Sequence, residues 1–321
     1  MPETIASPGL WAAFAAFLAV ALVVDLVVMD RRSSRSVDVR AALAWSVAWI
    51  ALALVFGAGL WAWLDATAGR EVADAKATEY LTGYLIEKSL SVDNIFVFLM
   101  LFTYFAVPPE QQRKVLVLGV LGAVVLRVVM ILVGAWLVTR FHWILYLFGL
   151  FLLVTGVKMI VFAGDQPDLE RNPVLRWMRA RLAITPGFHG DRYWVRRDGR
   201  RWFTPLFVVL VLIGVTDIVF AVDSIPAIFA ITKDPFIVMT SNVFAVLGLR
   251  ALYFVLADLA GRFHLLAYGL GAILVLVGLK MLAVDLFKVP AAWSLAAVAA
   301  ILGAAVAASL VFPPRTQGKV N

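Results

Sequence analysis

Long apolar segments dominate the hydropathy pattern of this chain. A helix needs about 20 apolar residues to cross the hydrocarbon core of a bilayer, and nine segments reach that length: about 10–29, 41–64, 80–106, 114–138, 142–163, 205–231, 236–258, 264–286 and 291–312. The runs are continuously apolar rather than alternating, which excludes the strands of a membrane β-barrel. We therefore expect an all-α polytopic membrane protein with about nine transmembrane helices. No basic stretch precedes the first segment, so we expect it to be retained rather than cleaved as a signal peptide.

The loops between these segments differ strongly in positive charge. One alternating set of loops holds 18 lysines and arginines, nine of them arginines within residues 171–201, whereas the opposite set holds five. In membrane proteins the cytoplasmic loops carry the excess of such residues. We therefore expect the N-terminus outside and the C-terminus in the cytoplasm.

Composition removes several classes of protein. Of the 321 residues, 63% are hydrophobic and only 15% are charged, which is too few charges for a soluble fold. The absence of cysteine excludes disulfides, thiolate metal sites and thiol redox chemistry, and three histidines offer few ligands for copper or zinc. No Walker sequence for ATP hydrolysis occurs. Since the positive loops account for the net charge of +7, we expect no nucleic acid partner. With these motifs and ligands missing, we also expect no enzyme activity and no cofactor.

The longest loop, about 164–204, is expected on the cytoplasmic side. Residues from Pro173 to Ile184 predict a short helix with arginines on one side, lying on lipid headgroups. The pair Asp198-Gly199, between two short extended stretches, indicates a type I′ hairpin. A nucleic-acid or regulatory site is one interpretation. An interfacial connector is favoured, because the positive-inside bias already accounts for the arginines.

Two stretches of the chain are similar to each other. Residues 140–159 and 262–281 match at nine of twenty positions, beginning with Arg-Phe-His and ending with Lys-Met. Upstream, the corresponding residues are Glu87 with Asp217, Asp93 with Asp223, and Arg127 with Arg250. Each copy holds three spans, and an odd number makes the copies enter the membrane from opposite sides. An inverted-topology repeat of this kind is typical of transporters that rock about a site near the midplane.

The repeat divides the chain into five parts. They are two N-terminal spans (1–79), the first three-helix unit (80–163), the cytoplasmic Arg-rich loop with its interfacial helix and hairpin (164–204), the second, inverted unit (205–287), and a last span with a short cytoplasmic tail (288–321). Three of the nine spans therefore lie outside the duplication.

Ionisable residues inside the spans cost about 3 kcal/mol each or more if they face lipid. Ten lie there: Asp25, Glu87, Lys88, Asp93, Arg127, Lys158, Asp217, Asp223, Arg250 and Lys280. We interpret Lys158 and Lys280 as structural, because long side chains near span ends can reach the interface. Four acids of the repeat stand against two arginines, and this excess favours a bound cation or proton over purely structural ion pairs.

Other oxygen ligands accompany these acids. Asn94 and Ser224 each follow the second acid of their copy, and Pro226 would free a backbone carbonyl nearby if the helix opens there. Glu87 and Asp93 are six residues apart, about 240° around a helix, so they face one site only if the helix is interrupted. An all-oxygen ligand set suits Mg²⁺, Mn²⁺ or Ca²⁺.

Several longer motifs surround these residues: EKSLSVDN at 87–94, FTYFAVPP at 102–109, GVLGAVVLR at 119–127, DIVFAVDSIPAIFA at 217–230, DPFIV at 234–238, SN at 241–242 and LGLRALY at 247–253. In these motifs the chain resembles the TerC family of integral membrane proteins, which includes bacterial manganese exporters. The similarity extends from about Trp11 to Asp285 and is densest at 80–163 and 205–285.

The resemblance implies manganese efflux across a bacterial inner membrane, linked to manganese tolerance, alkaline pH and, in some members, tellurite resistance. It also implies that Glu87, Asp93, Asp217 and Asp223 form the ion site. Family members often carry another acid three residues before the position of Asp217, where this chain has Gly214. This departure affects the number of ligands and the metal preference rather than the fold.

The leading hypothesis is therefore an exporter of divalent cations, with Mn²⁺ the first choice. Further candidate ligands are Asn94, Ser224, Asp25 and Asn242, and the candidate charge-balancing residues are Arg127 and Arg250. Moving a 2+ ion outward against 100 mV costs about 4.6 kcal/mol. Without ATP chemistry, a cytoplasmic excess of metal or inward proton flow must supply it, and proton antiport would use the same carboxylates. The expected partners are membrane lipids, Mn²⁺ and H⁺.

Three alternatives remain open from the sequence. A membrane scaffold or assembly factor would use its buried charges only as structural ion pairs. An intramembrane hydrolase with two aspartates is disfavoured, since no G-x-G-D sequence occurs and the repeat already explains the paired acids. An exporter of another small substrate, such as an amino acid, would share the fold but not the response to metal.

Overall fold

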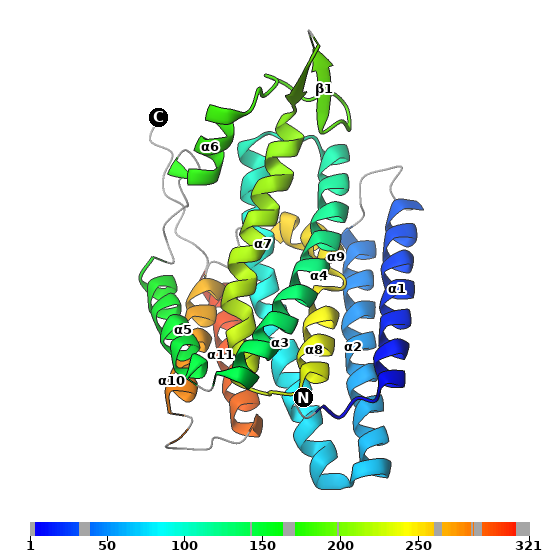
Figure 1. Cartoon of the computed structure of the whole chain (residues 1–321), viewed down its shortest axis with the longest axis vertical. Coiled ribbons are helices and arrows are strands. Elements are labelled where there is room, and N and C mark those ends of the chain that lie inside the picture. Colours follow the sequence, from blue (N-terminus) through cyan, green and yellow to red (C-terminus); the bar gives the residue numbers. More distant parts are fainter. Residues whose placement is uncertain are drawn as a thin grey trace.

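Long helices make up most of the described chain. The computed structural model describes residues 4–31, 39–141, 143–162, 171–197, 199–259, 265–283, 285 and 291–312. Most helices run along one axis, and a two-stranded hairpin stands beyond one end of the bundle (Figure 1). The elements are α1 (Pro8–Arg31), α2 (Val39–Ala68), α3 (Arg70–Tyr104), α4 (Pro109–Arg140), α5 (Ile144–Val161), α6 (Pro173–Arg181), β1 (Trp194–Arg197), β2 (Arg200–Phe203), α7 (Pro205–Phe229), α8 (Pro235–Val246), α9 (Leu249–Leu259), α10 (Leu266–Leu282) and α11 (Ala291–Val311).

Each of the nine apolar segments falls on helix, so the all-α polytopic class is confirmed. Within the described residues, six helices are long and apolar enough to cross a membrane, or seven if α8 and α9 count as one bent span. The remaining two segments are α3, which has 35 residues but carries several charges, and α10, which has 17 residues. A total of nine spans stays a prediction.

The one break in the described helical spans lies between α8 and α9, a place that the sequence did not single out. α7 continues through Pro226 and α3 continues past Glu87, so the condition under which Glu87 and Asp93 would face one site is not met in α3. Pro226 lies in the last turn of α7, so its missing N–H group leaves the carbonyl of Val222 without its intrahelical donor, but only one turn of helix follows. At the break, α8 and α9 are bent by 41°.

Gly248 makes this bend possible. Its φ of +80° lies in the left-handed region that glycine adopts without steric cost. A Cβ at this position would also lie 2.7 Å from Cδ1 of Trp49 on α2. The bend therefore depends both on backbone conformation and on the close approach of α2.

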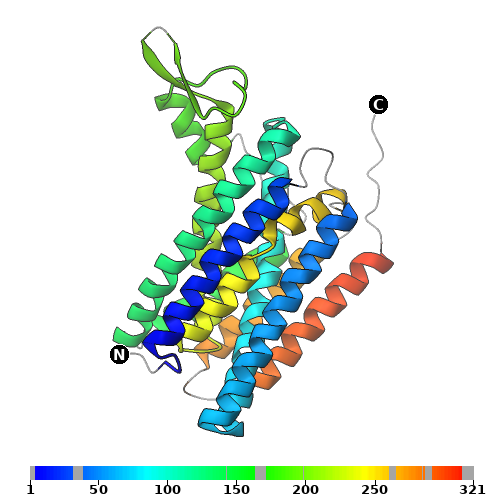
Figure 2. The same cartoon turned by 90° about the vertical axis from the view of Figure 1, so that its right-hand side faces the viewer.

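Aromatic packing attaches the two N-terminal helices to the bundle. The ring of Phe244 on α8 lies 4.7 Å from that of Phe56 on α2 and 5.4 Å from that of Phe17 on α1, centroid to centroid. Figure 2 looks onto α1 and α2, with α8 behind them. Buried aromatic pairs of this kind contribute about 0.5–1.5 kcal/mol beyond their buried area.

Helices α5 and α10 approach each other closely through glycines. A Cβ at Gly149 would lie 3.1 Å from the carbonyl oxygen of Gly278, and a Cβ at Gly156 would lie 2.7 Å from that of Gly271. Small residues let helix backbones come together inside a membrane, where packing rather than the hydrophobic effect drives association. The two contacts fix these helices against each other in antiparallel orientation.

The loop between α5 and α7 forms the predicted helix and hairpin. The helix α6 ends at Arg181, earlier than expected, because Ile184 already bridges to Phe203 of β2. In the hairpin Arg197 pairs with Arg200, and Gly199 has a φ of +72°, as a two-residue turn requires. Asp198 lies outside the described residues.

Candidate metal site

Arg127 of α4 joins four helices in the interior of the bundle. Its side chain is buried and forms an ion pair with Glu87 of α3. The same Nη1 atom donates to Oδ1 of Asn242 on α8 at 3.0 Å and to Oγ of Ser224 on α7 at 3.4 Å. A guanidinium carries five N–H donors in a planar fork, so one arginine can organise several acceptors. Arg127 also interacts electrostatically with Asp217 of α7.

Three buried oxygen atoms on α3 and α7, two of the helices that contact Arg127, have no hydrogen-bond partner within the described part of the chain. They are Oε2 of Glu87, Oδ1 of Asn94 and Oδ2 of Asp217, on residues that are 1%, 3% and 7% exposed. An unsatisfied buried acceptor costs about 1–3 kcal/mol, and more when it is charged. Such atoms in a native structure call for an explanation, and an ion or water bound between them is the usual one.

The structure describes the side chains of only part of the predicted ligand set, which stays a prediction. The side chains of Asp93 and Asp223 lie outside what the structure describes, although their backbones belong to α3 and α7. Among the described side chains, no three Asp, Glu, His or Cys residues gather as a metal site. Ser224 and Asn242 do meet at Arg127, and Asn242 is oriented further because its Nδ2 donates to the carbonyl of Val238 at 2.9 Å.

Asp25 occupies a different place, among α1, α2 and α9. Its Oδ1 accepts hydrogen bonds from the indole N–H groups of Trp45 and Trp49 at 2.9 and 3.2 Å, and its Oδ2 lies 3.4 Å from Nη2 of Arg250. Arg250 also donates to the backbone carbonyl of Asp25. These contacts favour a structural role for the pair, in contrast to the predicted roles of Asp25 as a ligand and of Arg250 as the counter-charge of the site.

A cavity of about 280 Å³ adjoins Arg127. Its polar lining consists of Asn94, Arg127, Thr155 and Lys158, and the rest is apolar. The sequence suggested that Lys158 only reaches the interface, and it gave no reason to single out Thr155. The two repeat counterparts differ in the structure: Lys280 donates to Ser294 at 2.9 Å, whereas Lys158 forms no hydrogen bond or ion pair with any described residue.

Lys88 has a role that its sequence position did not reveal. Its Nζ donates to the carbonyl oxygens of Ala245 and Leu247 at 3.2 and 3.4 Å, at the point where α8 ends. The last carbonyls of a helix lack intrahelical partners and attract positive charge. Lys88, which directly follows Glu87 on α3, thus secures the broken span beside the candidate site.

Comparison with known proteins agrees with the motifs. The family model described as "Integral membrane protein TerC family" matches residues 72–317. Proteins from Photorhabdus laumondii and from Escherichia coli K12, both named "Putative membrane-bound redox modulator Alx", are 52% identical over 300 residues, which is 94% of this chain and 94% of each relative. An uncharacterized membrane protein from Myxococcus xanthus is 46% identical over 308 residues, 96% of this chain and 94% of the relative. No solved structure matches the chain. The chain belongs to the TerC family of integral membrane proteins.

Proposed function

We propose that this protein exports divalent metal cations, with Mn²⁺ as the principal substrate, through a site beside Arg127. The observation that carries this proposal is that Glu87, Asn94 and Asp217 each keep one buried oxygen without a described partner, on the helices α3 and α7 that contact Arg127. Two carboxylates and an amide oxygen are hard ligands, which Mg²⁺, Ca²⁺ and Mn²⁺ prefer. A cation bound between them would satisfy the acceptors that the protein leaves open.

The types of ligand support a cation, whereas the described charges alone do not, because Lys158 also lines the cavity beside Arg127 and forms no hydrogen bond or ion pair with a described residue. The Arg127 guanidinium is paired with Glu87, and Arg250 is paired with Asp25 elsewhere. Asp217 has one carboxylate oxygen without any described partner. A cation bound to that open oxygen would offset a buried negative charge, which costs several kcal/mol inside a membrane if it is left alone.

The glycine contacts of α5 and α10 support the inverted repeat. By the repeat offset, Gly149 corresponds to Gly271, and Gly156 corresponds to Gly278. Gly149 contacts Gly278 while Gly156 contacts Gly271, so each contact is the image of the other. Reciprocal contacts of this kind are expected at a two-fold axis. Because the helices are antiparallel, that axis would lie in the membrane plane, as in transporters that alternate access by rocking.

Access from the cytoplasm fits the position of the 280 Å³ cavity. Lys158 lies in the last turn of α5, which leads into the arginine-rich loop that the positive-inside rule assigns to the cytoplasm. Metal would enter there, bind beside Arg127 and leave outward after the two units rock. Carboxylates that bind protons in exchange for metal would couple export to inward proton flow.

Ligand type and family resemblance together are the grounds for proposing Mn²⁺. Oxygen ligands alone leave Mg²⁺, Mn²⁺ and Ca²⁺ as candidates, and the resemblance to TerC-type manganese exporters favours Mn²⁺. Two relatives carry a name that refers to redox modulation. This chain has no cysteine, so a redox role here would not use thiols of its own.

Mn²⁺ flux in proteoliposomes tests the proposal. We would compare the wild type with Glu87→Gln and Asp217→Asn, and with Asp25→Asn as the matched control that removes a buried carboxylate from another place. Size-exclusion chromatography checks folding. Flux in the wild type and in Asp25→Asn, but in neither of the other variants, supports the site.

Two other results would contradict the proposed export of metal through these carboxylates. Absence of wild-type flux under every imposed metal and pH gradient would favour the scaffold or another substrate. Equal flux in all folded variants would remove the carboxylates from the mechanism. Flux that ignores an imposed pH gradient would exclude proton antiport while leaving metal export in place.

A further inference from the structure

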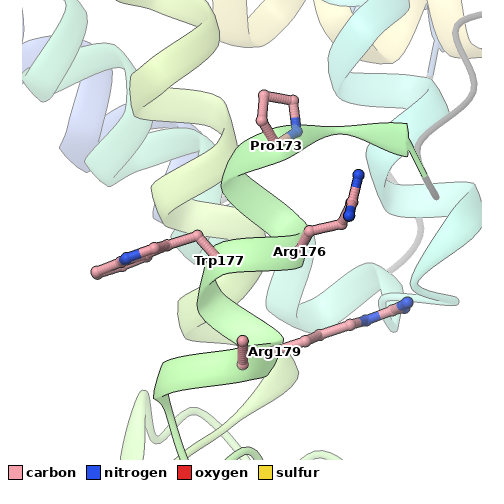
Figure 3. Close-up of a pocket in the computed structure, with 5 residues that line it drawn as sticks. Pro173, Arg176, Trp177 and Arg179 are labelled. Carbon is pink, nitrogen blue, oxygen red and sulfur yellow. The ribbon is translucent and has the colours of Figure 1, made fainter.

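The outer face of α6 carries an unusual combination of side chains. The residues Pro173, Arg176, Trp177, Arg179 and Ala180 line an open hollow of about 650 Å³. Figure 3 shows Trp177 projecting from one side of the helix and Arg176 and Arg179 from the other. The aromatic ring and the two guanidinium groups thus extend to opposite sides of the helix along one exposed strip of surface (Figure 3). Trp177 is 59% exposed, which is a large apolar surface to leave unburied.

The opposite face of α6 fixes this arrangement to the bundle. Leu175 and Met178 are 1% exposed and belong to the core at this end of the molecule. The side chain of Asn172 caps the first turn by accepting from the backbone N–H groups of Val174 and Leu175 at 2.9 and 3.1 Å. The outer face is therefore presented in one orientation, rather than by a loosely attached segment.

The hollow lies at the level where helices end. α6 packs against α7 near the beginning of that helix, and Nη2 of Arg179 donates to the hydroxyl of Tyr104, the last residue of α3, at 3.3 Å. The ends of transmembrane helices mark the interface between hydrocarbon and water, where tryptophan and tyrosine are enriched. Trp177 and Tyr104 are therefore suited to the headgroup layer.

The positive charge of this face of α6 favours an anionic ligand. The stretch 173–181 holds three arginines and no acidic residue. Arg176 forms no hydrogen bond or ion pair with any residue that the structure describes. In the hairpin, by contrast, the guanidinium of Arg201 lies over the ring of Trp194 at 5.1 Å. The planar fork of an arginine binds a phosphate through two parallel hydrogen bonds.

We propose that this face of α6 is a binding site for the phosphate headgroup of an anionic phospholipid in the adjacent leaflet. Arg176 and Arg179 bind the phosphate, and the Trp177 ring lies against the glycerol and upper acyl region. Nucleic acid would satisfy the arginines but would leave the indole without an apolar layer. The site is independent of the transported ion, because it needs only that this end of the bundle meets a bilayer surface.

Native mass spectrometry of the full-length protein in uncharged detergent tests this site. Phosphatidylglycerol and phosphatidylcholine with the same acyl chains would be titrated in turn. Each arginine near an anionic lipid surface contributes about five-fold in affinity, so Arg176→Gln with Arg179→Gln should weaken phosphatidylglycerol binding roughly thirty-fold. The matched control, Arg196→Gln with Arg197→Gln on β1, removes the same charge and should bind like the wild type.

Trp177→Ala separates the headgroup from free phosphate. It should weaken phosphatidylglycerol binding as well, since the indole contacts the lipid rather than the phosphate. Three results would overturn the proposal: no preference of the wild type for phosphatidylglycerol, equal weakening in the two arginine pairs, or displacement of the lipid by inorganic phosphate. The substituted side chains are exposed, and thermal unfolding of each variant would check that α6 remains folded.

Discussion

Asp217 and Asp25 are both buried aspartates, but their surroundings predict opposite effects of removing the charge. Asp217 is 7% exposed with one oxygen lacking a described partner, whereas Asp25 is 5% exposed with its oxygens engaged by two indoles and Arg250. If Asp217 is a ligand, the metal-free protein pays for keeping its charge buried. Asp217→Asn should then stabilise the metal-free protein, while Asp25→Asn should destabilise it.

The magnitudes follow from the two kinds of site. Asp217→Asn removes the buried charge but keeps an amide oxygen in its place and loses the attraction to Arg127, so it should raise the free energy of unfolding of the metal-free protein by only about 1 kcal/mol, the low end of the cost of an unsatisfied buried acceptor. Breaking a buried ion pair costs about 3–5 kcal/mol, which sets the expected loss for Asp25→Asn. Metal at a hundred times its dissociation constant should stabilise the wild type by about 2.7 kcal/mol. Asp25→Asn should keep that gain and Asp217→Asn should lose it.

Thermal unfolding in detergent, with and without Mn²⁺, measures both effects in one experiment. A chelator control defines the metal-free state, and Ca²⁺ and Mg²⁺ in place of Mn²⁺ test selectivity. The reasoning is refuted if Asp217→Asn lowers the metal-free unfolding temperature as Asp25→Asn does, because Asp217 would then be structurally paired. It is refuted equally if Asp217→Asn retains the full metal-dependent shift.

Three further predictions concern the scaffold of the site. Gly248→Ala should lower the free energy of unfolding by about 1–3 kcal/mol, since it strains a positive φ and brings a Cβ to 2.7 Å from an α2 tryptophan. Gly214→Ala is the control, because nothing lies within 4 Å of the added Cβ. It should raise the free energy of unfolding by up to about 1 kcal/mol, and thermal unfolding measures both variants. Asp234→Ala removes the N-terminal cap of α8 and the hydrogen bonds that Asp234 accepts from Thr4 and Ile5, so it should lower the free energy of unfolding by about 1–2 kcal/mol. Hydrogen exchange at residues 4–7 should rise, and unchanged exchange there would contradict this. Asn172→Ala removes the N-terminal cap of α6, so it should lower the free energy of unfolding of this helix by about 1 kcal/mol and raise hydrogen exchange in α6 alone. An equal rise across the bundle would show that α6 does not unfold as a separate unit.

The open space at Gly214 bears on the departure from the family pattern. The resemblance implied that other family members carry an acid at this position, three residues before Asp217 and on the same side of α7. Because an added Cβ meets nothing within 4 Å, the helix here can accept Gly214→Asp. Comparing its metal-dependent stabilisation with that of the wild type would show whether the position tunes the ligand set.

The sequence alone determined the elements and the class of the protein. Hydropathy is a local property, and a run of about 20 apolar residues must be helical in lipid because every backbone N–H and C=O group needs an internal partner. The hairpin at Gly199 was equally local, since a two-residue turn requires a positive φ. The motifs around Glu87 and Asp217 were sufficient to identify the TerC family, which the comparisons confirmed.

Only the tertiary structure decided which charges belong together. Arg127 contacts Glu87, Ser224 and Asn242, which lie on three other helices. Such contacts depend on how distant segments pack, and Asn242 lies 115 residues from Arg127 along the chain. Spacing along a helix gave no means to separate a structural acid such as Asp25 from one with an open oxygen.

The same limit explains why the sequence did not indicate the break between α8 and α9. A proline signals a lost hydrogen bond wherever it occurs, but helix α7 tolerates Pro226 in its last turn. At Gly248, by contrast, the close approach of Trp49 and the carbonyl contacts of Lys88 stabilise the bend. Local sequence thus set where helices form, whereas the partners supplied by other helices decided where one breaks and which oxygens remain free to bind an ion.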